Sequence, residues 1–289
     1  MNTQKLTLNN TNKRIDVLEQ KLNKILNLLE ESDSTKEAKP KKFFINIETM
    51  EHSNKGIVNQ VKFLSTEFTD ENDNFFVQLP KIWVNIKENP IIKVSLFPQD
   101  GYMELTPQAI SKYKNSWIDG KVRSIPNVAP DLNQFSYLKS LKLCKWANGE
   151  MLNWKTVLYI QLVWLCEYGT IQNNDILPNE KYNWSSERDC AFGDTGKGIG
   201  EFLGIEQLFT SGRNLVDLSN PETELWGLYK EWNFDKDFNP NEKFALWCDY
   251  NPDEESEAGF FSDWYGDVRY ASWYGDDVAL RLCKKPYSF

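Results

Sequence analysis

Aromatic side chains crowd the last thirty residues of the chain and carry its clearest signal for binding chemistry. Nine of these residues are Phe, Trp or Tyr, and a near-duplicate occurs nine residues apart: Trp264-Tyr265-Gly266-Asp267 and Trp273-Tyr274-Gly275-Asp276. Large, rigid rings give much contact area for little loss of rotamer entropy, so recognition surfaces favour Trp and Tyr. We therefore expect a recognition surface here. The alternative is a loop-rich apolar edge packed inside the domain.

Residue types that serve catalysis or metal binding are scarce. His52 is the one histidine, which leaves zinc sites and His-based triads little to draw on. No paired catalytic carboxylates stand out. The five cysteines have no CxxC spacing and favour reduced, mostly buried thiols; they are Cys144, Cys166, Cys190, Cys248 and Cys283. We expect no enzymatic activity, no cofactor and no metal.

Three further motifs have the residue types of a binding site but are expected to be structural. The glycine-rich residues 193–200 resemble a phosphate loop, but Gly198 follows Lys197 where a P-loop needs Ser or Thr. We expect a glycine-rich surface loop. The acidic residues 253–257 indicate a solvated loop more than a calcium site. Glu167, near a helix end, is expected to be structural, with a functional role as the alternative.

Composition limits the possible partners. The 289 residues include 33 basic and 42 acidic side chains, and the net charge of −9 argues against a nucleic-acid partner. The first ten residues are polar and do not form the apolar stretch of a secretory signal. The apolar residues 157–166 are too few to span a bilayer, so no membrane insertion is expected.

The first thirty-two residues have a heptad pattern that predicts a coiled coil. Its seam consists of Leu8, Ile15, Leu22 and Leu29 at position a, and of Leu18 and Ile25 at position d. Leu26 and Leu28 widen the seam, which favours a homotrimer. The alternative is one amphipathic helix packed on its own domain. The polar residues 33–42 are expected to be a linker.

Residues 43–289 are expected to form an α+β head, with a β-rich lead-in over 43–130 and a core over 131–289. Alternating apolar residues predict strands around 82–86 and 92–96, with a turn at 98–101 and loop from there to residue 131. Residues 154–169 predict a buried helix, capped by Asn153 and ended by Gly169. Further strands are expected at 244–248 and 278–283.

Four segments resemble the C-type-lectin-like domain of bacteriophage virion proteins, over about residues 75–289. They are FFVQLPKIWVNI with VSLFPQDGY, NWKTVLYIQLVWLCEYGTIQNND, NPETELWGLYKEW, and the closing DVALRLC. The domain is related in fold to formylglycine-generating enzymes and to variable receptor-binding proteins. The chain departs from the family pattern at residues 277–279, where Gly-Phe is usual.

The resemblance implies a virion fibre protein, of the head or the tail, whose lectin-like head attaches to the host surface. In receptor-binding relatives the segment before the closing strand contacts the ligand. It corresponds here to Trp264, Tyr265, Asp267, Arg269, Tyr270, Trp273 and Tyr274. The expected partners are two further copies of the chain, other virion proteins at the N-terminus, and a host glycan or protein. The alternatives are an architectural decoration protein and an oxidase of the formylglycine-generating type.

Overall fold

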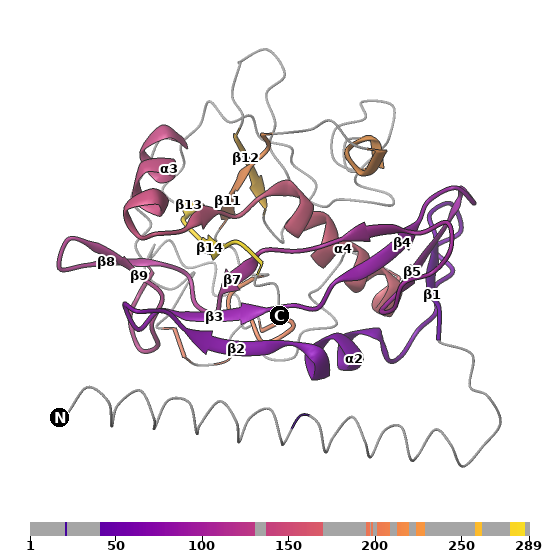
Figure 1. Ribbon diagram of the computed structural model, residues 1–289, viewed down its shortest axis with the longest axis horizontal. Coiled ribbons are helices and arrows are strands. Elements are labelled where there is room, and N and C mark those ends of the chain that lie inside the picture. Colours follow the sequence, from indigo (N-terminus) through magenta and orange to yellow (C-terminus); the bar gives the residue numbers. More distant parts are fainter. Residues whose placement is uncertain are drawn as a thin grey trace, which may run out of the picture. The chain divides into compact units, whose positions relative to one another are not determined.

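The computed structural model describes residues 21, 41–130, 137–169, 195–196, 198, 201–208, 213–219, 224–228, 258–261 and 278–286. The chain divides into two units, residues 1–41 and 42–289. Lys21 of the first unit is helical, and the six residues of the predicted coiled-coil seam lie outside the described residues. Every strand in Figure 1 belongs to the second unit.

Two antiparallel sheets form most of the β structure of the second unit (Figure 1). The four-stranded sheet has the order β1-β5-β4-β6, built from Phe43–Asn46, Ile91–Ser95, Ile82–Asn85 and Met103–Leu105. The five-stranded sheet has the order β10-β14-β7-β3-β2, built from Glu150–Met151, Leu282–Lys284, Ala109–Ser111, Phe75–Gln78 and Thr66–Thr69. The last strand, β14, thus pairs with β7 from the first half of the chain.

Two smaller β structures complete the described part of the unit. In the three-stranded sheet, β11 (Arg213–Asp217) lies between β12 (Ala258–Phe261) and β13 (Val278–Ala279). Strands β8 (Ser116–Ile118) and β9 (Lys121–Arg123) form a hairpin. With helices packed beside mainly antiparallel sheets, the unit belongs to the α+β class.

Helix α4 (Trp154–Tyr168) is the central element and confirms the predicted helix with both of its caps. The side chain of Asn153 accepts a hydrogen bond of 2.9 Å from the backbone N–H of Thr156. Gly169 ends the helix in the left-handed conformation with φ 64°, which glycine adopts without steric cost. Buried residues cover every face of α4, as expected for a helix inside a core.

Helix α4 packs in one core cluster with the four-stranded sheet and with α2 (Ile57–Leu64). The predicted alternation of strands β4 and β5 is confirmed, because Ile82 and Val84 are buried in that cluster together with Ile92 and Val94. Full burial of such a side chain contributes about 1.5–3 kcal/mol relative to exposure. This cluster therefore packs the four-stranded sheet and α2 against α4.

Several elements differ from the sequence-based expectation. The region expected to be loop up to residue 131 contains β6, β7, β8 and β9, each of three residues. The expected closing strand is two strands, β13 and β14, which belong to different sheets and are separated by Leu280 and Arg281. Helices α2 and α3 (Tyr137–Trp146) were not predicted. The expected strand at 244–248 lies outside the described residues.

Candidate functional site

The seven residues predicted to contact a ligand lie outside the described residues, but the strands on either side of them are described. Phe261, which ends β12, and Ala279, which ends β13, both pair with Asn214 of β11. Since neighbouring strands lie about 4.8 Å apart, Phe261 and Ala279 are about 10 Å apart on the two sides of one strand. Residues 262–277 therefore connect two strands that flank the same strand, β11.

Arg281 lies two residues after β13, the strand that follows this segment, and is fully buried. Its Nε donates to Asn214 Oδ1 at 3.0 Å and its Nη1 to the carbonyl of Ser111 at 2.8 Å. Its Nη2 donates to the carbonyls of Glu206 at 2.9 Å and Gln207 at 3.2 Å. Burial lowers the pKa of Arg281 to about 10, so the guanidinium stays charged at neutral pH. One side chain thus connects β7, β11 and the segment 201–208.

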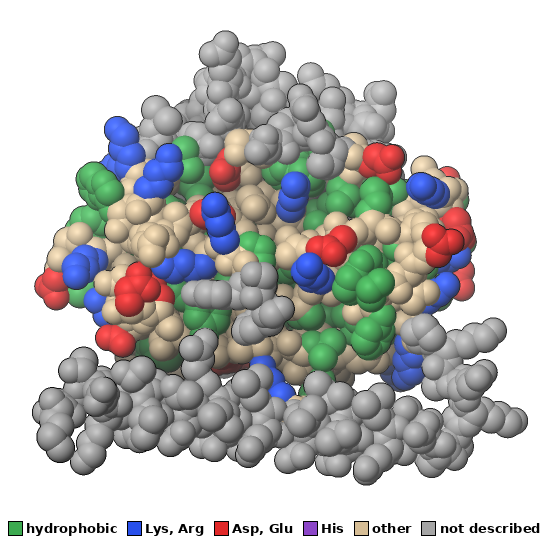
Figure 2. Space-filling model, viewed as in Figure 1, with side chains coloured by type: hydrophobic (Ala, Val, Ile, Leu, Met, Phe, Trp, Pro, Cys, Tyr) green, Lys and Arg blue, Asp and Glu red, His purple; other side chains and the backbone are tan. Residues whose placement is uncertain are grey.

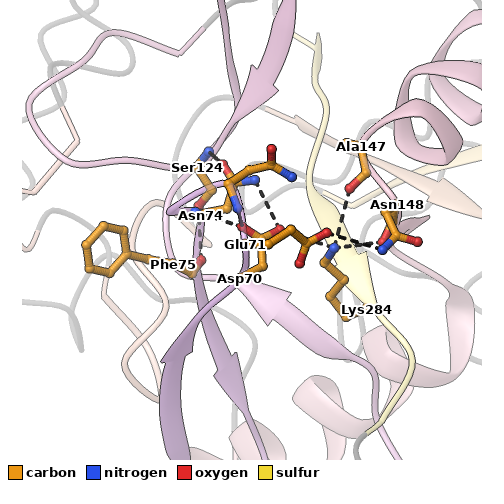
Figure 3. A network of polar contacts seen from close by, with 9 residues as sticks. Asp70, Glu71, Asn74, Phe75, Ser124, Ala147, Asn148 and Lys284 are labelled. Atoms are coloured by element: carbon orange, nitrogen blue, oxygen red, sulfur yellow. Dashed lines mark hydrogen bonds and ion pairs between the residues drawn. The ribbon is translucent and has the colours of Figure 1, made fainter. Parts of the chain in front are cut away.

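A second polar cluster surrounds Lys284 on strand β14 (Figure 3). Its Nζ lies 3.1 Å from Asp70 Oδ2, and both side chains are at most one-tenth exposed. The same ammonium donates to the carbonyl of Asn148 at 2.7 Å and that of Ala147 at 3.3 Å. These carbonyls follow the C-terminal end of α3, where a positive charge is favourable. Lys284 therefore joins α3 to the five-stranded sheet.

Asp70 organises the turn between β2 and β3 within this cluster. Its Oδ1 accepts the backbone N–H groups of Asn72 at 2.9 Å and Asn74 at 3.0 Å, and its Oδ2 accepts the Asn74 side-chain amide at 3.2 Å. Burial raises the pKa of Asp70, but the hydrogen bonds from Asn74, Lys284 and Asn72 together outweigh it and hold the pKa below its usual value. The carboxylate is ionised at neutral pH and is fully engaged in holding the turn.

Glu167, for which a functional role was the alternative, caps another element. Its Oε2 accepts backbone N–H groups from Gly56 at 3.1 Å, Ile57 at 3.0 Å and Val58 at 3.3 Å. These amides lie at the start of helix α2, and its N-cap residue Gly56 has no side chain to satisfy them. A carboxylate placed there stabilises a helix N-terminus. Glu167 therefore connects the end of α4 to the start of α2, which is a structural role.

Of the glycine-rich segment 193–200 the structure describes Thr195, Gly196 and Gly198. Thr195 is fully buried, and its hydroxyl lies 2.6 Å from the carbonyl oxygen of Ile125. The backbone N–H of Gly196 donates to Glu206 Oε2 at 2.7 Å, so this amide is already paired with a carboxylate of the chain itself. A Cβ at Gly196 would lie 2.7 Å from Pro126 Cβ. Gly196 and Gly198 are exposed as predicted, and the burial of Thr195 is the correction.

Three thiols are described, and all are free and buried as predicted. Burial raises the pKa of Cys144 to about 12, and it raises the pKa values of Cys166 and Cys283 strongly as well. Because the thiolate is the nucleophilic form, these thiols are inert at neutral pH. Cys190 and Cys248 lie outside the described residues.

Sequence reasoning did not single out Arg281, Lys284 or Asp70 as centres of polar networks. A signal was present for Arg281, because an arginine between Leu280 and Leu282 interrupts an apolar closing segment. The partner Asp70 lies more than two hundred residues away in sequence, and nothing in the local pattern indicates the pairing. Within the described ranges, His, Cys, Asp and Glu side chains form no group of three or more suited to a metal ion.

Among the described residues, no helix combines the length and the apolar character needed to cross a membrane. Comparison of the chain with protein-family models, with curated proteins and with solved structures found no match.

Replacing Arg281 by Lys is expected to lower the free energy of unfolding by about 2–4 kcal/mol. One ammonium cannot reach acceptors that lie on three different segments, so buried carbonyls lose their donors. Urea unfolding at neutral pH measures the change. The control is Lys285→Met, whose side chain is 85% exposed, and which should shift stability by less than about 0.5 kcal/mol. An unchanged midpoint for Arg281→Lys would contradict the role assigned to this guanidinium.

Asp70→Asn is expected to destabilise the protein at neutral pH and to lose much of that effect in acid. Because the folded-state pKa of Asp70 lies below its unfolded value, its charge stabilises the fold above about pH 4, and this contribution disappears as the pH falls through the folded-state pKa. Unfolding titrations at a series of pH values compare the variant with wild type. Asp73→Asn, at an exposed position in the same turn, is the control. A stability difference independent of pH would refute the assignment.

Proposed function

We propose that this chain is a structural fibre protein of a bacteriophage particle, whose second unit attaches the particle to the host surface. The proposal includes a C-type-lectin-like fold for the head and a trimeric coiled coil for residues 1–32. It rests on the sequence resemblance together with the way in which the strands hold the aromatic segment 262–277.

The observation that carries the proposal is the attachment of the aromatic segment to two strands of one sheet. Its two ends continue into β12 and β13, which flank β11, and β13 is followed at once by the buried residues Leu280 and Arg281. Binding residues are commonly found on loops that a rigid scaffold positions. A segment rich in Trp and Tyr, whose two ends continue into the strands beside β11, suits contact with a host glycan or protein.

The chemistry of the described residues favours binding over catalysis. An oxidase of the formylglycine-generating type depends on reactive cysteines, and burial keeps Cys144, Cys166 and Cys283 protonated at neutral pH. The carboxylates of Asp70 and Glu167 already accept hydrogen bonds from backbone amides. We therefore propose a protein without enzymatic activity or cofactor, located in the virion.

Oligomerisation would multiply weak contacts. Three heads joined by a coiled coil would meet the host surface together, so single contacts of low affinity would add through avidity. The N-terminal residues would also join the fibre to other virion proteins. An architectural decoration protein is the second candidate; unchanged adsorption of particles that lack the chain would favour it.

Trp273→Ala combined with Tyr274→Ala is expected to weaken binding to host cells about tenfold or more, because exposed rings at a binding site supply much of the contact energy. Binding of the labelled full chain to host cells measures the effect, and circular dichroism checks the fold. The control is Phe97→Ala, an aromatic side chain that is 56% exposed and lies outside the segment. If the double variant unfolds while Phe97→Ala does not, the rings belong to the core and the attachment proposal fails.

Deletion of residues 1–32 is expected to convert a trimer into a monomer, because the deletion removes the whole predicted seam. Sedimentation equilibrium of both proteins measures the mass. The full chain with Leu18→Asp and Ile25→Asp, which keeps its length but places charges in the seam, should behave like the deletion. A full chain that is monomeric at micromolar concentration, or a trimer that survives both changes, would refute the proposed assembly.

A further inference from the structure

Helix α3 has one face in the core and an opposite face that is basic. Ser140, Leu143 and Cys144 are buried, and the last two belong to the second core cluster. The exposed residues lie together within about a third of the helix circumference. They are Lys139, Lys142, Lys145 and Trp146. Figure 2 shows blue and green side chains together over α3, at the upper left of the view.

Trp146 is the most exposed large hydrophobic side chain among the described residues, at 77%. It lies four residues after Lys142 and seven after Lys139, so all three project from neighbouring positions on the helix. An indole so placed offers a flat apolar face beside two ammonium groups. Isolated exposed hydrophobic residues are common, and it is the combination with the lysines that needs an explanation.

The β8–β9 hairpin adds a second ring on the same side. Trp117 pairs directly with Val122 across the hairpin, so both side chains project from one face. Val122 belongs to the core cluster that contains Leu143 and Cys144, and the hairpin lies on the same side of the unit as α3 in Figure 1. Trp117 is 40% exposed. We refer to Lys139, Lys142, Lys145, Trp146 and Trp117 as the α3 surface.

The stretch of sequence that contains α3 is basic. No acidic residue occurs between Asp131 and Glu150 in the sequence. Residues 231–277 contain thirteen acidic and three basic side chains, and the rest of the chain contains 29 acidic and 30 basic ones. The overall charge of −9 thus arises from residues 231–277, and the rest of the chain is nearly neutral.

We propose that the α3 surface binds a phosphate-bearing polysaccharide. Lysine ammonium groups bind phosphate as point charges, and indole rings pack against the apolar faces of sugar rings. Lys139 to Lys145 span about 9 Å along the helix axis, which suits a chain of spaced groups more than one isolated anion. Duplex DNA carries a charge every 1.7 Å or so, and three ammonium groups would leave most of these unpaired. Sparse phosphates separated by sugars match the surface better.

The test uses the purified full chain and three probes: dextran substituted with phosphate groups, unsubstituted dextran, and a DNA oligonucleotide. We expect binding to the phosphorylated dextran that weakens as salt is added. Lys142→Gln with Lys145→Gln should weaken it about tenfold, and Trp146→Ala about fivefold. Matched controls are Lys81→Gln with Lys87→Gln, which makes the same charge change elsewhere, and Phe97→Ala. Neither control should alter the affinity.

Four results would overturn the proposal. They are an absence of binding to phosphorylated dextran, equal binding of unsubstituted dextran, tighter binding of the oligonucleotide, and equal effects of the α3 variants and their controls. Lys142→Arg with Lys145→Arg keeps the charge and should retain binding, which separates loss of charge from loss of fold. Trp273→Ala with Tyr274→Ala should also retain it, because this inference is independent of segment 262–277 and of host attachment. Loss of binding there would assign the polymer to that segment instead.

Discussion

Burial of a guanidinium requires an acceptor for nearly every N–H group that it carries, because the uncompensated loss of water is costly. Arg281 meets this requirement with carbonyls from Ser111, Glu206 and Gln207 and with the amide oxygen of Asn214. These acceptors come from three separate segments, which must all be in place before the side chain can be buried. Arg281 therefore links β7, β11 and residues 206–207, which do not belong to one sheet.

The same principle extends to the other buried polar groups. Lys284 satisfies carbonyls beyond the end of α3, Asp70 satisfies amides of a turn, and Glu167 satisfies amides at the start of α2. In each case a charged side chain satisfies backbone groups, within its own turn for Asp70 and on another element for Lys284 and Glu167. The charges of the interior are thereby committed to architecture, and those of the α3 surface remain at the solvent boundary.

Elements with a strong local pattern could be predicted from the sequence, and those that depend on distant partners could not. Helix α4 has fifteen residues and recognisable caps, and β4 and β5 alternate clearly. Strands β6 to β9 have three residues each, too few to establish a period, and the three lysines of α3 interrupt its apolar positions. The candidate binding segment was predicted from composition, but its support by β11 is a long-range pairing with no local signal.

The position of β12 and β13 on the two sides of β11 has a consequence for evolution and for engineering. Because the attachment points are set by backbone hydrogen bonds, the intervening stretch can drift in sequence without altering them. The entropic cost of closing a loop rises by only about 0.6 kcal/mol for each doubling of its length. Insertions and exchanged peptides between Phe261 and Val278 should therefore leave the pairing of β12 and β13 with β11 intact.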